Sequence, residues 1–403
     1  MKIGKRILQG IGIIVGICVL YFLIVAFAPG FEVPEKHLKK AKEQVGESDP
    51  KPPLSRKEVR FPVRGTSVDA WLYLPEELSA PVPCIVMGHG FGGTKDMLEP
   101  YASRFQKAGF AVLVFDYRHF GESDGEPRQL IWIPYQLEDW STAINYARGL
   151  KGIDPGKIAL WGTSMSGGHV MVTASKDNRI ACVVAQCPGL DGRASGEMFL
   201  KKVGIGYILR MMVHGQRDMF RSWLGLSPHK IPIAGKPGSI AFLTTSDAHD
   251  FFGKVVPETF INEVCARIIL RGDKYRPVEY ARDVRCPVLL QICDHDSIIP
   301  KSAAEETEKK LGKYAEVKHY PIGHFDIYVG DDFERSVRDQ LDFLKNTFER
   351  CRSDKKVKTF LFTEIKSPTY KPGIIARFGC LERGFDLLTF RWLKEQWPVD
   401  RRE

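Results

Sequence analysis

The sequence lacks the cysteine patterns that indicate a disulfide framework or a zinc site. Its nine cysteines are an odd number, none forms a C-x-x-C pair, and no histidine follows at zinc-finger spacing. None of the four asparagines lies in an N-x-Ser/Thr sequon. The sequence therefore predicts no metal centre, and it favours a reducing compartment, on the cytoplasmic side of a membrane, for the folded part of the chain.

A basic patch on the folded body, which nucleic-acid binding requires, is also missing. The 403 residues carry a net charge of +9, but residues 1–56 hold nine Lys and Arg against five acidic residues, and residues 350–403 hold thirteen against seven. Residues 57–349 are consequently close to neutral. This distribution argues against a nucleic-acid partner. It favours contact between the two basic ends and a membrane surface. With 44% hydrophobic residues, the chain can still bury an ample core.

An uncharged run of 22 residues extends from Ile7 to Ala28. At about 1.5 Å per residue, a helix of that length reaches about 33 Å, enough to cross a bilayer once. We predict that residues 1–28 are a single-pass membrane anchor and that the polar residues 29–56 are a tether. The alternative is a cleaved signal peptide ending at Ala28, which the length of the run and the following Pro29 disfavour. Basic residues flank both sides, so the orientation stays open.

Beyond the tether, strand-like and helix-like patterns alternate. Apolar runs such as PCIVMGH, KIALWG and CPVLLQIC are separated by amphipathic stretches of helical period. The alternation predicts an α/β fold with a mostly parallel central sheet and helices on both faces, formed by residues 57–190 and 281–349. Residues 191–280 interrupt it with helix-rich segments. We interpret this insertion as a helical lid, called the cap from here on, whose large apolar residues at 198–212 are expected to face the substrate.

A strand–turn–helix pattern surrounds Ser164 in the segment IALWGTSMSGG, residues 158–168. A nucleophile elbow needs small neighbours because its turn is sharp and the helix that follows packs tightly on the strand. Such a turn holds a hydroxyl clear of the sheet at the N-terminus of a helix. Ser166 departs from the G-x-S-x-G pattern, which has glycine at that position.

Two further candidates follow later strands in the order Ser, Asp, His. Asp296 comes just after CPVLLQIC, and His324 comes just after VKHY. The carboxyl ends of parallel strands meet at one edge of a sheet, so these side chains are expected to meet Ser164 there. Asp294 is the alternative acid. His319 is expected to be a packed strand residue.

Two further predictions concern residues close to Asp296 and His324. Asp326 is expected to brace the loop that carries His324. Reading Asp294, His295 and Asp296 as metal ligands is disfavoured, since strand alternation directs His295 away from its neighbours.

The sequence resembles the α/β-hydrolase superfamily of serine hydrolases over about residues 57–349. The motifs that carry the resemblance are HGFGG at 89–93, GFAVLVFDYRHFGESDG at 109–125, WGTSMSGG at 161–168, DSIIP at 296–300 and GHFDIY at 323–328. It is most similar to the esterase, dienelactone-hydrolase and serine-aminopeptidase-like branches.

The resemblance implies acyl transfer through a covalent ester on Ser164, with His324 as the base and Asp296 as the group that orients it. The main-chain N–H groups of Phe91 and Met165 would form the oxyanion hole. The residues expected to support that loop are His89, Gly90 and Gly92. No metal or organic cofactor is implied.

These observations predict a membrane-anchored serine hydrolase that acts on a small-molecule acyl substrate, a carboxylic ester or else a thioester or amide. An acyltransferase that uses the same three residues is one alternative. A catalytically silent binding or scaffold protein on this fold is another. A halide-releasing enzyme is disfavoured, since that chemistry needs a carboxylate where Ser164 stands.

The basic tail, residues 350–403, contains an apolar stripe at helical spacing. Its members are Ile374, Phe378, Leu381, Phe385, Leu388 and Trp392. The stripe predicts an amphipathic helix, which would either lie on a membrane or pack on the hydrolase body.

Overall fold

The computed structural model of the chain describes residues 2–31, 56–76, 80–254, 256–257 and 259–364. The chain divides into two units, Met1–Cys351 and Arg352–Glu403. In the second unit only the end of helix α9 (Gly330–Glu364) is described. The predicted tether lies almost entirely, and the predicted C-terminal amphipathic helix wholly, outside the described residues.

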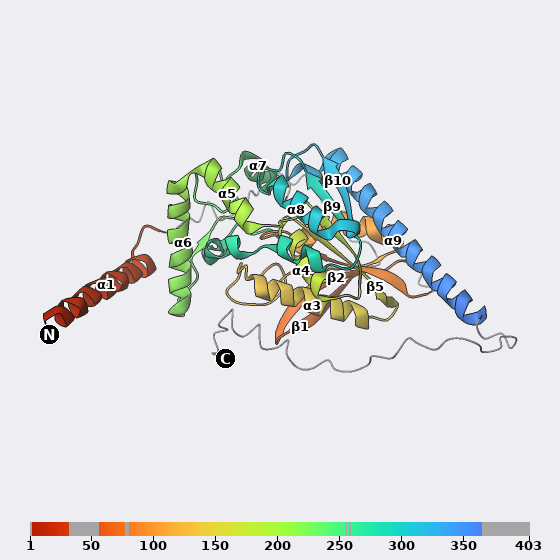
Figure 1. The fold of residues 1–403 in the computed structure, drawn as a ribbon, viewed down its shortest axis with the longest axis horizontal. Helices are drawn as coiled ribbons and strands as arrows, with labels where there is room; N and C mark the ends of the chain where they lie inside the picture. Colours follow the sequence, from red (N-terminus) through yellow and green to blue (C-terminus); the bar gives the residue numbers. More distant parts are fainter. Residues whose placement is uncertain (1, 32–55, 77–79, 255, 258, 365–403) are drawn as a thin grey trace. The chain divides into compact units, whose positions relative to one another are not determined.

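An eight-stranded sheet forms the centre of the first unit (Figure 1). Its strands, in spatial order, are β1 (Arg56–Val63), β2 (Thr66–Tyr73), β4 (Ala111–Phe115), β3 (Val82–Gly88), β5 (Ile153–Thr163), β6 (Ile180–Gln186), β9 (Val288–Cys293) and β10 (Ala315–Tyr320). Strand β2 pairs antiparallel with both β1 and β4, and all other neighbours are parallel. The mostly parallel sheet predicted from the alternating pattern is confirmed.

Helices cover both faces of this sheet (Figure 1). They are α2 (Glu99–Lys107), α3 (Ile133–Gly149), α4 (Met165–Lys176), α8 (Lys301–Leu311) and α9. Consecutive residues of a strand point to opposite faces. Leu160 of β5 packs in the cluster that includes α3, α4 and α8, whereas Trp161 packs against Tyr101 of α2 and the side chains of α9. Burial on both sides explains why the strands read as continuous apolar runs.

The cap connects β6 to β9 and is rich in helices, as predicted. Its main elements are α5 (Gly192–Val203), α6 (Ile205–Trp223), α7 (Ser246–Lys254), β7 (Lys230–Ile231) and β8 (Val264–Cys265). Three 3-10 helices follow at Ala266–Leu270, Gly272–Lys274 and Pro277–Asp283. Other 3-10 turns in the core are Lys95–Leu98, Gly312–Tyr314 and Asp326–Tyr328.

The N-terminal helix α1 (Lys2–Phe27) contains a window, Gln9–Phe27, with a mean hydropathy of 2.8, of which 11% is buried. It is long and apolar enough to cross a membrane, a test that a signal sequence would also pass. Its last turns contact α6 of the cap. The rings of Phe22 and Phe220 lie 4.6 Å apart, and Arg217 donates to the main-chain oxygens of Val25 and Ala28, each at 2.9 Å.

Candidate active site

Ser164 occupies a sharp turn between β5 and α4. Its φ of 53° lies in the left-handed region that non-glycine residues seldom adopt, so this backbone is strained. A Cβ atom at Gly162 would lie 2.3 Å from the main-chain oxygen of Ser166, and one at Gly168 would lie 2.3 Å from that of Gly189. The small residues noted in the sequence are therefore required, because helix and strand approach too closely for side chains.

Ser166, the departure from the usual glycine, is fully buried and its hydroxyl is satisfied. Its Oγ forms a hydrogen bond with the hydroxyl of Tyr117, which also accepts one from Trp140 Nε1 at 2.7 Å. A buried hydroxyl is costly only when it lacks a partner. Tyr117 supplies that partner, so serine fits this elbow.

The turn brings Ser164 to the two residues predicted to meet it. His324 Nε2 lies 3.1 Å from Ser164 Oγ, and His324 Nδ1 lies 2.6 Å from Asp296 Oδ2. The carboxylate can only accept, so Nδ1 carries a proton and Nε2 faces the serine hydroxyl. Asp296 is fixed in turn, since its Oδ1 accepts the main-chain N–H groups of Ile298 and Ile299 at 2.8 and 2.7 Å.

Asp294 does not contact His324. It pairs with Lys301 Nζ at 2.6 Å and with His319 Nδ1 at 2.9 Å. The expectation that His319 is packed is wrong, because β10 is the edge strand and this side chain is 43% exposed. Asp326 does brace the loop as expected, since it accepts the N–H of Gly323 at 2.8 Å.

Burial and charge oppose each other at His324. Burial lowers the pKa of this imidazole, but the neighbouring Asp296 carboxylate more than offsets that effect and raises the pKa to about 9. The site thus stabilises the imidazolium ion, which is the form the histidine takes after it accepts a proton.

The glycine loop after β3 lies against the serine. A Cβ atom at Gly90 would be 3.1 Å from Ser164 Cβ, and one at Gly92, which has a φ of +68°, would be 2.3 Å from Ile233. His89 Nδ1 donates to the main-chain oxygen of Gly90 at 3.0 Å. Phe91, from this loop, and Met165, the first residue of α4, both line the cavity that holds Ser164 and His324. The structure therefore brings all the predicted site residues to one place.

This cavity has a volume of about 660 Å³ and is lined by residues of both the core and the cap. Its apolar walls include Phe91, Phe242, Phe251, Phe252, Ile298 and Phe325. The rings of Phe91 and Phe242 stack with centroids 4.1 Å apart, and those of Phe251 and Phe325 are 4.8 Å apart. Aromatic side chains of the core and the cap thus meet above the serine.

The expectation that residues 198–212 face the substrate is wrong for Leu200 and Met212, which are exposed and do not line the cavity. The apolar stripe of α6 continues toward the contact with α1 and points away from the site. Sequence reasoning missed the cap aromatics. The one available signal was the Phe251-Phe252 pair in a helix whose other residues are mostly polar.

Among the described residues, no group of three or more His, Cys, Asp and Glu is arranged to hold a metal ion. The side chains that meet at Ser164 can instead activate a hydroxyl, orient a base and receive an apolar group, which is the arrangement that nucleophilic acyl transfer uses.

Comparison with known proteins agrees with this geometry. A family model described as the alpha/beta hydrolase fold matches residues 83–225. The chain is 43% identical over 299 residues to quorum-quenching protein AidA of Acinetobacter baumannii (strain MDR-ZJ06), covering 73% of this chain and 95% of that protein. It is 43% identical over 283 residues to thiohydrolase apmlB of Arthrinium phaeospermum, covering 67% and 91%.

Among solved structures, the alpha/beta hydrolase GrgF from Penicillium sp. sh18 superposes with a TM-score of 0.61 at 25% identity, covering 73% of this chain and 99% of that one. Together with the 95% coverage of the Acinetobacter relative, these matches show that the chain belongs to the α/β-hydrolase family.

Proposed function

We propose that this protein hydrolyses carboxylic esters through a covalent acyl-enzyme on Ser164. The observation that carries the proposal is the chain of hydrogen bonds from Ser164 through His324 to Asp296 at the floor of an apolar cavity. Neither a nucleophile alone nor a cavity alone would support it. Membership of a hydrolase family agrees with the reaction class.

The reaction would begin with attack of Ser164 Oγ on the substrate carbonyl while His324 Nε2 takes the hydroxyl proton. The negative charge that develops on the carbonyl oxygen would be bound by the N–H groups of Phe91 and Met165, at about 2.7–4 kcal/mol for each well-placed donor. His324 then protonates the leaving alcohol. In the second half, His324 activates a water that cleaves the acyl-enzyme and frees Ser164.

The cavity supports an apolar acyl or aryl substrate. Its volume of about 660 Å³ suits a small molecule, and the cap residues that line it are mostly apolar, including Phe242, Phe251 and Phe252, beside the charged Asp191. Thioesters and amides react through the same steps, and the relative named a thiohydrolase keeps thioesters among the candidates.

We also propose that α1 anchors the enzyme to a membrane, with the catalytic domain on the cytoplasmic side. The support is an apolar window of 19 residues that is 11% buried, combined with seven described cysteines that are all free.

The reaction is tested with a fluorophosphonate probe, which transfers its phosphonyl group to an activated serine and releases fluoride. The full-length protein should be labelled at Ser164, and Ser164→Ala should abolish labelling and lower kcat for ester hydrolysis by ~10⁴–10⁶. Ser141→Ala is the matched control, since Ser141 is exposed on α3 and does not line the cavity, so both measurements should stay unchanged.

Labelling that persists in Ser164→Ala refutes the assignment. Labelling without ester hydrolysis, accompanied by transfer of the acyl group to an added alcohol or amine, would identify an acyltransferase instead.

A further inference from the structure

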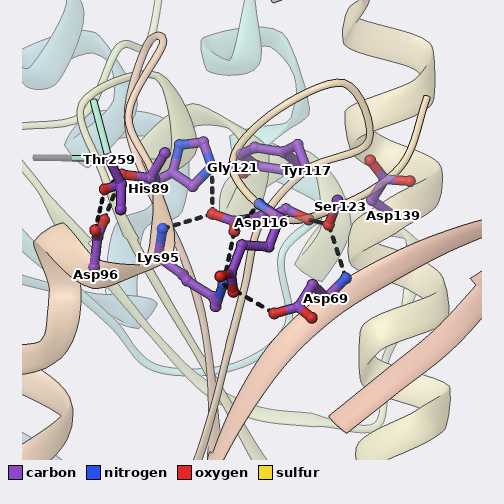
Figure 2. Close-up of polar contacts among 12 residues, drawn as sticks. Asp69, His89, Lys95, Asp96, Asp116, Tyr117, Gly121, Ser123, Asp139 and Thr259 are labelled. Atoms are coloured by element: carbon purple, nitrogen blue, oxygen red, sulfur yellow. Dashed lines mark hydrogen bonds and ion pairs between the residues drawn. The ribbon is translucent and has the colours of Figure 1, made fainter. Parts of the chain in front are cut away.

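Lys95 is a buried lysine directly after the glycine loop, here called the oxyanion loop, residues 89–94. It is 2% exposed, and its Nζ lies 2.9 Å from Asp69 Oδ1, 2.9 Å from Asp116 Oδ2 and 2.7 Å from Glu122 Oε2 (Figure 2). An ammonium ion is buried at a cost of several kcal/mol unless it is paired. Burial alone would lower the pKa of Lys95, but the carboxylates hold it above its usual value, so the side chain is charged.

One of these three carboxylates, that of Asp116, also binds the main chain of Lys95. Asp116 Oδ1 accepts the main-chain N–H of Lys95 at 2.7 Å, and Asp116 Oδ2 accepts that of Glu122 at 3.0 Å. A Cβ atom at Gly121 would lie 2.1 Å from Asp116 Oδ2, so only glycine leaves room for this arrangement. The DYRHFGESDG motif, residues 116–125, thus binds the end of the oxyanion loop.

The start of the loop lies beside the same carboxylate. His89 Nε2 is 4.0 Å from Asp116 Oδ1, and the His89 ring packs edge-on against Tyr117 with centroids 4.7 Å apart (Figure 2). Asp116 therefore lies beneath both ends of the loop that carries Phe91. Lys95 itself does not line the cavity, so it does not touch the substrate.

We propose that Lys95 is a positioning residue, which fixes the Asp116 carboxylate and thereby holds the oxyanion loop with the Phe91 N–H directed at the developing oxyanion. This inference rests on the proposed ester hydrolysis. Misplacing one donor of an oxyanion hole costs about 10²–10³ in kcat, and the substrate contacts made elsewhere in the cavity are unaffected. Loss of Lys95 should therefore lower kcat and leave KM nearly unchanged.

If Lys95 had a purely structural role, kcat would recover together with stability in a variant that removes both charges of the pair. Lys95→Met leaves the Asp116 carboxylate uncompensated and should be destabilised. Lys95→Met/Asp116→Asn removes both charges, so stability should largely return. The N–H groups of residues 95 and 122 bind different oxygens of Asp116, so one of them would face the NH2 donor of an Asn at position 116. The loop therefore stays poorly fixed in the double variant.

The readout compares two ketone inhibitors of equal chain length on the full-length protein. A trifluoromethyl ketone adds Ser164 Oγ to its carbonyl carbon as the proton passes to His324, which places an oxyanion in the hole, whereas the methyl ketone only occupies the cavity. In the double variant, the preference for the trifluoromethyl ketone and kcat should both fall about 10²-fold, with KM within about threefold and a melting temperature near that of the parent.

Arg60→Met is the matched control, since Arg60 pairs with Asp69 in the same network but does not contact the loop. It should leave the inhibitor preference unchanged. A double variant that recovers stability, kcat and inhibitor preference together would overturn the proposal. If the parent protein neither hydrolyses esters nor binds the trifluoromethyl ketone more tightly, the proposed function fails instead.

Discussion

The two walls of the cavity are built differently. On the core wall, Ser164, Asp296 and His324 are positioned by strand ends and by directional hydrogen bonds. The cap wall includes the rings of Phe242, Phe251 and Phe252, which contribute no polar contact to the site. The core wall thus fixes the geometry of the reaction, whereas the cap wall sets a shape that substitutions can change.

The two parts also differ in where they place apolar and charged side chains. The cap exposes large apolar side chains on α6, with Trp223 at 66%, Ile205 at 61% and Leu209 at 57%. The core buries its charged network around Lys95. Catalysis should therefore be sensitive to single polar changes in the core, while the cap should tolerate changes that alter which substrate is accepted.

The largest effect is expected at the core acid. Asp296→Asn should lower kcat by about 10⁴, because the amide favours the wrong tautomer of His324 and cannot stabilise the imidazolium ion. Asp294→Asn should change kcat by less than about threefold, since Asp294 faces Lys301 and His319. Steady-state kinetics of both variants test the assignment, and the opposite order of effects would transfer the role to Asp294.

The pH dependence should be the next largest effect. Only neutral His324 can accept the serine proton, and its pKa is raised to about 9. Well below that pH, kcat/KM should increase about tenfold per pH unit, and the total increase between pH 7 and pH 9 should be about 50-fold. Removing the Asp296 carboxylate leaves burial as the main influence, so the acid limb of Asp296→Asn should move to lower pH. If the acid limb does not move, the observed titration belongs to a group other than His324.

The residues of the core wall could be predicted from sequence, and those of the cap wall could not. Ser164, Asp296 and His324 each follow a buried strand, and parallel strands necessarily bring their carboxyl ends together. No comparable rule places Phe242 or Phe252, because the cap packs through irregular tertiary contacts.

The network around Lys95 could not be predicted from the sequence, for a related reason. Lys95 and Asp116 lie in motifs that are easy to see, but their pairing depends on a close approach between two loops. Ser166 is similar, since the partner that makes it acceptable, Tyr117, is 49 residues away.

The cap wall should control substrate choice with a moderate effect. Phe242→Ala and Phe252→Ala should change the preference between long and short acyl esters by about 10–200-fold, the range that one methylene in a hydrophobic pocket provides. Hydrolysis of an acetyl ester should change much less. Leu209→Ala is the control, since Leu209 is exposed on α6 and should leave both activities unaltered. Equal losses on long and short esters would show that these rings only support the fold.

The smallest effect on catalysis should come from α1, which contacts α6 of the cap through residues that do not line the cavity. A chain that begins at Pro53 should keep kcat within about threefold of the full-length value, because none of the residues that line the cavity is removed. It would, however, expose more of the half-buried Phe220, which packs against Phe22.

Location should change completely with the same truncation. The full-length protein should resist extraction from membranes by high salt and by alkaline carbonate, because crossing a bilayer buries far more apolar surface than an interfacial contact. The truncated chain should be released by either treatment. If it remains on membranes until high salt is added, a second membrane contact exists. That contact would be the attraction between basic residues and anionic lipid, which salt screens. Recovery of the full-length protein in soluble form, with its N-terminus missing past Ala28, would identify α1 as a signal peptide, and the cap would then meet water on the surface that α1 now covers.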